Sequence, residues 1–257
     1  MLTGIPVRMA TMKRRGFALI MGLLVLLSIT AMATTGRYDE QIQQAVSQKV
    51  HSSKQLQSVN ASVEDGIVTL TGSVNLYQDK LEAAKKIKKL DNVTGIRNDI
   101  VVAGATVPDD QLQKKLAKQI AYDRVGYYDN TFNYIALNVK DGVVTLDGDT
   151  VYDVPKDSAL AIVARTPGVK DVVNDVNVLP VSRFDDSIRM RTATAIYRDS
   201  VLGRYASDPA HPIRIVVDNG HVTLYGTVEN TMDKNIAGMR ANSVPGAFSV
   251  ENKLMVD

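Results

Sequence analysis

The sequence of 257 residues contains no cysteine and no tryptophan, and it has only three histidines. The missing cysteine excludes disulfides, zinc–thiolate and iron–sulfur sites, thiol nucleophiles and lipid attachment at a cysteine. Hydrophobic residues make up 45% of the chain, which is too many for an intrinsically disordered polymer. The length predicts one to three folded domains.

An excess of charge of one sign is also missing. The formal net charge is +2, but four of the 30 Lys and Arg residues lie within residues 1–33, which contain no acidic residue. The remaining chain has 26 basic and 28 acidic residues. Because nucleic-acid binders are generally basic, we expect no nucleic acid among the partners.

Residues 1–33 have the pattern of a secretory signal peptide. Three basic residues, 13–15, precede an apolar run from Phe17 to Ala33 that ends in Ala31-Met32-Ala33. This order predicts cleavage after about Ala33. An uncleaved membrane anchor remains the alternative, because the run nearly reaches the ~20 residues that span a bilayer. Either interpretation places the rest of the chain outside the cytoplasm, in the periplasm or secreted.

The remaining chain repeats one pattern three times, at residues 65–72, 141–148 and 219–226. Each segment starts with Asp-Gly or Asn-Gly, continues with alternating apolar residues, and has a second glycine six residues after the first. A lysine, an alanine and an asparagine follow the second glycine at offsets of eight, 11 and 26 residues. Conserved spacing of this kind is the signature of internal repeats. The glycines and asparagines of the motif are Gly66, Gly72, Asn98, Gly142, Gly148, Asn174, Gly220, Gly226 and Asn252.

The first glycine of each segment predicts a β-hairpin. Asp-Gly or Asn-Gly between alternating apolar runs favours a type I′ turn, in which both central residues have positive φ. This register pairs Val63 with Val68 and places the second glycine on the buried face of its strand. A glycine there predicts either a helix backbone that crosses closely or a kinked strand.

An amphipathic helix is expected on each side of every hairpin, followed by a closing strand. The helix before the hairpin starts with two acidic residues, which suit the positive end of a helix dipole; the third such helix is predicted to bury Ile188, Ile196 and Val201. Each closing strand, such as 96–102, carries its asparagine in phase with apolar neighbours. We therefore expect each asparagine to face inward and to bind nearby backbone.

The predicted fold is α+β: three tandem αββαβ units, each a small mixed sheet with two helices on one face. The expected boundaries are 1–33 for the signal peptide or anchor and 38–103, 108–179 and 183–257 for the three units. The short connections leave little freedom for separation of the units.

The order of elements resembles the BON domain. The resemblance rests on the core Gly66-x-Val68-x-Leu70-x-Gly72, the following Lys80 and Ala83, and the closing Ile96-x-Asn98, with matching residues in the other two copies. It implies a non-catalytic protein, without cofactor, that associates with anionic phospholipid surfaces and supports the cell envelope under osmotic or other stress. Without a cysteine, the chain is similar to the soluble periplasmic members rather than to the lipoproteins.

Catalytic or metal-binding patterns are scarce. No His-x-x-x-His, Gly-x-Ser-x-Gly or phosphate-loop motif is present. His221 is expected to face Asp218 across the third hairpin turn as a surface pair. Asp147 and Asp149 flank Gly148, and we interpret them as a solvated face, because no third ligand follows at a useful spacing. We predict no catalytic residue and no metal site.

Basic helices are the candidate binding surface. Basic residues beside an apolar stripe are attracted to anionic lipid head groups, although a solvated face of a core-packed helix has the same pattern. Aromatic residues cluster after the first helix of the second unit, as expected for a membrane interface or for packing between units. The candidate lipid-binding residues are Lys80, Lys85, Lys86, Lys88, Lys89, Lys114, Lys115, Lys118, Tyr127 and Tyr128.

Two functions are compatible with these patterns. The first is a periplasmic or secreted protein that binds anionic phospholipid or another envelope component and supports envelope integrity. The alternative is an array that binds periplasmic proteins, in the manner of a chaperone, without binding lipid. The sequence leaves the oligomeric state open.

Overall fold

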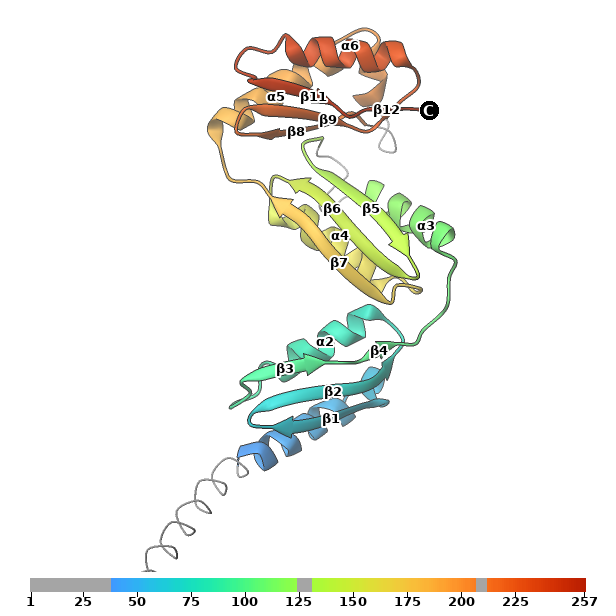
Figure 1. Ribbon diagram of the computed structural model, residues 1–257, viewed down its shortest axis with the longest axis vertical. Helices are drawn as coiled ribbons and strands as arrows, with labels where there is room; N and C mark the ends of the chain where they lie inside the picture. The colour runs from blue at the N-terminus through green and yellow to red at the C-terminus, as the bar shows by residue number, and fades with distance from the viewer. Residues whose placement is uncertain (1–37, 124–130, 207–211) are drawn as a thin grey trace, which may run out of the picture. The chain divides into compact units, whose positions relative to one another are not determined.

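The computed structural model describes residues 38–123, 131–206 and 212–257, and its elements fall into three successive units (Figure 1). Each unit contains two helices and a small sheet. In each sheet the central strand lies between the strand that precedes it in the chain and the closing strand, and it pairs with the closing strand in parallel. The α+β fold in three tandem repeats is therefore confirmed. The predicted signal peptide lies outside the described residues.

The first repeat starts with helical residues 38–51 and the short 3-10 helix η1 (Lys54–Leu56). Its central strand β2 lies between β1 and β3, and both β3 and β4 pair with it in parallel. The closing strand, expected as one element, is thus divided in two. The remaining elements are β1 (Val59–Glu64), β2 (Ile67–Val74), α2 (Tyr77–Ile87), β3 (Gly95–Asn98) and β4 (Val101–Val102).

The second repeat has the most continuous sheet. Strand β6 pairs antiparallel with β5 and parallel with β7. The parallel ladder runs without interruption from the pair Val143 and Asp171 to the pair Thr150 and Val178. Figure 1 shows α3 and α4 on the same face of this sheet. The elements are α3 (Asp109–Ala121), β5 (Tyr134–Lys140), β6 (Val143–Thr150), α4 (Asp153–Arg165) and β7 (Asp171–Val178).

The third repeat has the same order, with a 3-10 helix, η2, before its hairpin as in the first repeat, and with its central and closing strands each divided in two. Helix α5 ends at Tyr197, so Val201 lies beyond the helix. The prediction that Val201 belongs to the buried stripe of this helix is therefore wrong. The elements are α5 (Arg183–Tyr197), η2 (Leu202–Ala206), β8 (Arg214–Asp218), β9 (His221–Tyr225), β10 (Thr227–Val228), α6 (Thr231–Asn242), β11 (Ser249–Asn252) and β12 (Met255–Val256).

Each core lies between the helices and one face of the sheet. In the second repeat, α3 contributes Leu112, Leu116 and Ile120, at the 3–4 residue spacing of an amphipathic helix. These side chains are buried together with Val144 and Leu146, which alternate along β6. The apolar residues that helical spacing predicts on α3 and that strand alternation predicts on β6 therefore pack together in one buried layer.

The hairpin turns have the predicted geometry. Both central residues have positive φ in every repeat, for example 51° at Asp65 and 76° at Gly66. In the second and third repeats the strands pair in the expected register, with Val139 opposite Val144 and Val217 opposite Val222. The sequence pattern thus identified both the turn and the alignment of the strands that it connects.

The second glycine of each repeat has a positive φ, and in the second and third repeats the backbone that approaches it belongs to residues 134 and 212, not to a helix. Gly72, Gly148 and Gly226 are half-buried or exposed, not buried as predicted, and their φ angles are 103°, 124° and 122°. A side chain at Gly148 would collide with the carbonyl oxygen of Tyr134 on the neighbouring strand. The third repeat breaks here into β9 and β10, and the first breaks its parallel ladder after Leu70. A crossing helix is therefore excluded at Gly148 and Gly226, and the strand is broken near the glycine in the first and third repeats but not in the second, where both ladders of β6 continue through Gly148.

Candidate functional site

The lysines of the first repeat lie along α2 and the turn that follows it. Lys85 is exposed in the last turn of the helix, whereas Lys80 and Lys86 are half-buried, and the Lys86 Nζ lies 3.4 Å from the Ser53 Oγ. Because α2 ends at Ile87, Lys88 and Lys89 belong to the exposed turn that follows the helix. The sequence had placed them on the helix itself. Basic residues in this position interact favourably with the negative end of the helix dipole.

The lysines of the second repeat are displayed on α3. Leu112, Leu116 and Ile120 turn inward, and Lys114, Lys115 and Lys118 are exposed on the rest of the helix. The predicted solvated face and the predicted lipid-binding face are therefore the same surface. Tyr127 and Tyr128 lie outside the described residues.

A hollow of about 460 Å³ lies beside this basic face, between the C-terminal halves of α3 and α4. Lys115 and Arg165 supply positive charge, and Tyr122, whose side chain is half exposed, supplies an aromatic ring. The rest of the lining consists of the Asp123 carboxylate, the polar groups of Gln119 and Thr166, and the apolar Ile162 and Pro167. Arg165 and Tyr122 were absent from the residues predicted to bind lipid, because they lie on different elements and meet only in the folded repeat.

An aspartate of the first helix holds the hairpin turn in every repeat. In the first repeat, the Asp39 carboxylate accepts hydrogen bonds of 2.9 Å from the backbone N–H groups of both Asp65 and Gly66. Asp109 binds the second turn in the same way, at 2.6 and 2.9 Å, and Asp185 binds the third at 3.3 and 2.7 Å. The sequence suggested only a helix-dipole role for these acids. Their bonds to the turn are charge-assisted and satisfy two amides at once.

The motif asparagines were all predicted to face inward, but they do not all do so. Asn174 is exposed, whereas Asn98 and Asn252 are half-buried. Asn174 is exposed although Val172 and Val176, in phase with it on β7, are half-buried and buried, so alternation along the strand did not determine the burial of the asparagine. The bonding of the motif asparagines to backbone is confirmed in the third repeat, where Asn252 donates to the Lys234 carbonyl at 2.7 Å. This bond links β11 to α6, so the asparagine has a structural role.

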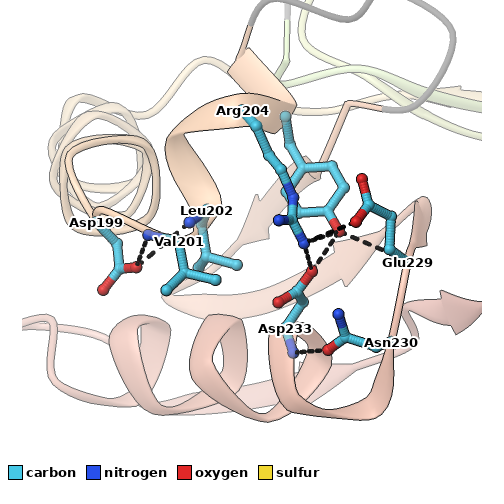
Figure 2. A network of polar contacts seen from close by, with 8 residues as sticks. Asp199, Val201, Leu202, Arg204, Glu229, Asn230 and Asp233 are labelled. Carbon is cyan, nitrogen blue, oxygen red and sulfur yellow. Dashed lines mark hydrogen bonds and ion pairs between the residues drawn. The ribbon is translucent and has the colours of Figure 1, made fainter.

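The third repeat contains a buried polar network that the motif did not predict (Figure 2). The Asp233 carboxylate, on a residue only 1% exposed, accepts from the Arg204 guanidinium and from the Tyr205 hydroxyl. The same hydroxyl accepts from the Glu229 N–H at 2.9 Å, and Asn230 caps α6 by accepting from the Asp233 N–H at 2.8 Å. The network joins η2 to the start of α6.

A second ion pair of this repeat lies at the other end of η2. Figure 2 shows the Asp199 carboxylate beside the N–H groups of Val201 and Leu202, and it also accepts from Arg240 at 2.8 Å. The bond from Val201 and then that from Arg240 lower the pKa of Asp199 below its ordinary value. Asp199 therefore stabilises the connection as a carboxylate.

The acidic and histidine side chains that the sequence singled out do not gather into one group in the part of the chain that the structure describes. No set of three or more His, Asp or Glu side chains there could hold a metal ion. His221 lies opposite Asp218 in the strand register, as expected, and its Nδ1 lies 2.7 Å from the Ser249 hydroxyl. Asp147 is exposed, and Asp149 lies 3.5 Å from the Asn177 amide. Within the same residues, no helix is long and apolar enough to cross a bilayer.

The fold and these surfaces define a class: tandem α+β modules whose most regular polar features hold turns and helices together. The BON domain family model matches residues 38–104, 108–180 and 194–257. The chain therefore belongs to the BON domain family, with three copies in tandem. BON domains are generally non-catalytic and associated with the cell envelope.

Solved structures with some likeness to the chain come from type III secretion systems. A structural protein of this system from Chlamydia trachomatis, CdsD, is 14% identical and covers 86% of this chain and 91% of its own, with a TM-score of 0.25. The periplasmic domain of the inner membrane protein PrgH from S. typhimurium is 10% identical over 79% of this chain and 95% of its own, with a TM-score of 0.20. At such TM-scores nothing about the function of this chain follows from them. No curated protein matches the sequence.

Proposed function

We propose that the protein binds anionic phospholipid surfaces of the cell envelope from the periplasmic or secreted side, without catalysis, and thereby supports envelope integrity under stress. The observation that carries the proposal is the exposed positive charge of the first two repeats. Six lysines remain in solvent after the helices have packed on their sheets, namely Lys85, Lys88, Lys89, Lys114, Lys115 and Lys118.

The binding energy available from these lysines is modest. A basic residue close to an anionic membrane surface contributes about 1 kcal/mol, and this attraction falls off within a Debye length. Three lysines on one repeat therefore give a reversible contact, and two repeats that bind at once increase the avidity. The hollow beside α3 brings the cationic groups of Lys115 and Arg165 next to the ring of Tyr122, and the Asp123 carboxylate in the same lining offsets part of their charge.

Sedimentation with vesicles tests the proposal. We expect the full chain to sediment with phosphatidylglycerol vesicles and not with phosphatidylcholine vesicles, and we expect sedimentation to decline as the salt concentration rises. Reversal of Lys85, Lys88 and Lys89 to Glu, or of Lys114, Lys115 and Lys118 to Glu, should weaken sedimentation about tenfold or more. Equal reversal of Lys49, Lys54 and Lys140, which are also exposed, is the matched control.

Two results would contradict the proposal. One is sedimentation that does not depend on the charge of the lipid, and the other is an equal loss in the control and in both lysine variants. If the protein does not sediment with either kind of vesicle and instead suppresses the aggregation of unfolded periplasmic proteins, the chaperone-like alternative replaces lipid binding.

A further inference from the structure

The three hairpin turns differ in the side chain that covers their glycine. The covering residue lies 28 positions after the turn glycine and is Thr94, Lys170 or Phe248 in successive repeats. Its atoms approach the place that a Cβ on the glycine would take to 3.0 Å for the Thr94 Oγ1, 3.1 Å for the Lys170 Cδ and 2.7 Å for the Phe248 Cδ2. The same position is thus occupied by a small, a long cationic and an aromatic side chain.

The third repeat fills the space beside its turn with its own rings. Phe248 packs against Phe184, with ring centroids 5.6 Å apart, and Phe184 directly precedes Asp185, which holds the turn. Gly220 of the turn is buried, although Phe248 itself keeps 69% of its surface exposed. An aromatic ring is therefore compatible with this position on the turn.

The first repeat leaves the corresponding space open. Tyr38 precedes Asp39 as Phe184 precedes Asp185, but the short side chain of Thr94 stands where the third repeat has Phe248. The result is a hollow of about 580 Å³, lined by Tyr38 and Ile42 on its apolar side and by Asp39, Asp65, Asn92 and Thr94 on its polar side. Tyr38 is 55% exposed at its edge.

Two carboxylates give the polar side of this hollow a negative charge. Asp39 and Asp65 line it, and the neighbouring Glu40 and Glu64 are exposed. The Asp39 carboxylate already accepts from the turn, whereas no hydrogen bond or ion pair of the Asp65 carboxylate is found among residues 38–123, 131–206 and 212–257. Opposite charge on a partner would therefore be attracted, and an anionic lipid surface would be repelled.

We infer that this hollow is a docking site for a segment of a partner protein that carries an aromatic ring next to basic residues. The ring takes the place that Phe248 holds in the third repeat, between the hairpin turn and the side chain of Tyr38. The basic residues lie against Asp65, Glu40 and Glu64. None of the lysines proposed to bind lipid lines the hollow.

The absence of tryptophan from the chain makes a direct test possible, because a tryptophan-containing peptide is then the only source of indole fluorescence. The probe is a capped Arg-Trp-Arg peptide titrated with the full chain, and the control peptide is Glu-Trp-Glu. We expect the emission of Arg-Trp-Arg to shift to shorter wavelength on binding. We expect Glu-Trp-Glu to bind at least about tenfold more weakly.

Variants locate the site. Thr94→Phe places the ring of the third repeat into the hollow and should weaken binding about tenfold or more, whereas the matched Thr94→Ser should bind as the unaltered chain does. Asp65→Asn should weaken binding several-fold and make it less sensitive to salt. Tyr38→Ala removes a ring that lines the hollow and should also weaken binding several-fold, which provides a second test if Thr94→Phe does not fold. Reversal of Lys85, Lys88 and Lys89 should leave peptide binding intact even if it abolishes vesicle binding.

Three results would overturn the inference. They are an unshifted emission of Arg-Trp-Arg, equal binding of the two peptides, and equal binding by the Thr94→Phe and Thr94→Ser variants. Concentration-dependent self-association of the chain, lost both in Thr94→Phe and in Phe248→Ala, would show that the occupant is a second copy and not a different protein.

Discussion

The first and third repeats share a motif but use it differently. Both hold the hairpin turn with an aspartate of the first helix. The third repeat then covers its turn with two phenylalanine rings and ties η2 to α6 through Asp233, whereas the first repeat leaves a hollow at its turn and exposes lysines after α2. The comparison teaches that one fold can direct its variable side chains toward internal stability or toward external partners.

The largest expected effect comes from the position before the motif lysine, which is Asp79 in the first repeat and Asp233 in the third. Asp233→Ala removes the acceptor of Arg204 and Tyr205 from a buried site, so we expect a loss of about 3 kcal/mol in the free energy of unfolding. Asp79→Ala, at a half-buried position, should cost less than about 1 kcal/mol. Chemical denaturation measures both. Equal losses would mean that the network does not distinguish the repeats.

The aspartates that hold the turns should rank next. Asp185 is 4% exposed and Asp39 is half-buried, so the turn amides of the third repeat are less able to bind water when the carboxylate is removed. We expect Asp185→Ala to cost about 2 kcal/mol and Asp39→Ala about 1 kcal/mol in unfolding free energy. Glu40→Ala, next to Asp39 and exposed, serves as the control and should change little. A larger loss for Asp39→Ala than for Asp185→Ala would reverse the proposed order.

The smallest effect is a difference in alkaline stability. Burial raises the pKa of Tyr197 in the third repeat to about 12, although Arg214 nearby opposes this rise. The unfolded chain loses this proton near pH 10, so the stabilisation is complete below pH 10 and disappears as the pH rises toward 12. Tyr197→Phe should therefore flatten the decline of unfolding free energy in this range. Tyr38→Phe, at an exposed ring of the first repeat, should leave the decline unchanged.

Local features of the fold were predictable from the sequence, and contacts between distant residues were not. Asp65-Gly66 identified the first turn because positive φ is a property of the dipeptide itself. The contact of Asp39 with this turn spans 27 residues, so its sequence position suggested only a helix-dipole role. The inward direction of Asn174 was wrong although its neighbours in phase, Val172 and Val176, are half-buried and buried, because alternation gives the phase of a strand and not the depth to which the helices cover it.

The candidate sites follow the same rule. The exposed lysines of α3 could be predicted because helical periodicity separates them from Leu112 and Leu116. Arg165 could not be placed beside Lys115, because it lies on α4 and the repeat motif does not specify it. The hollow of the first repeat became visible only when Thr94 and Phe248 were found at the same place in two folded units.

The central claim, that exposed lysines of the first two repeats bind anionic lipid, is tested most directly by a variant that reverses all six to Glu. Its sedimentation with phosphatidylglycerol vesicles at low salt is compared with that of the unaltered chain and of the Lys49, Lys54 and Lys140 control. The account predicts that the six-fold variant stays in the supernatant while the control sediments with the vesicles. Sedimentation of the six-fold variant to the same extent as the unaltered chain would contradict it.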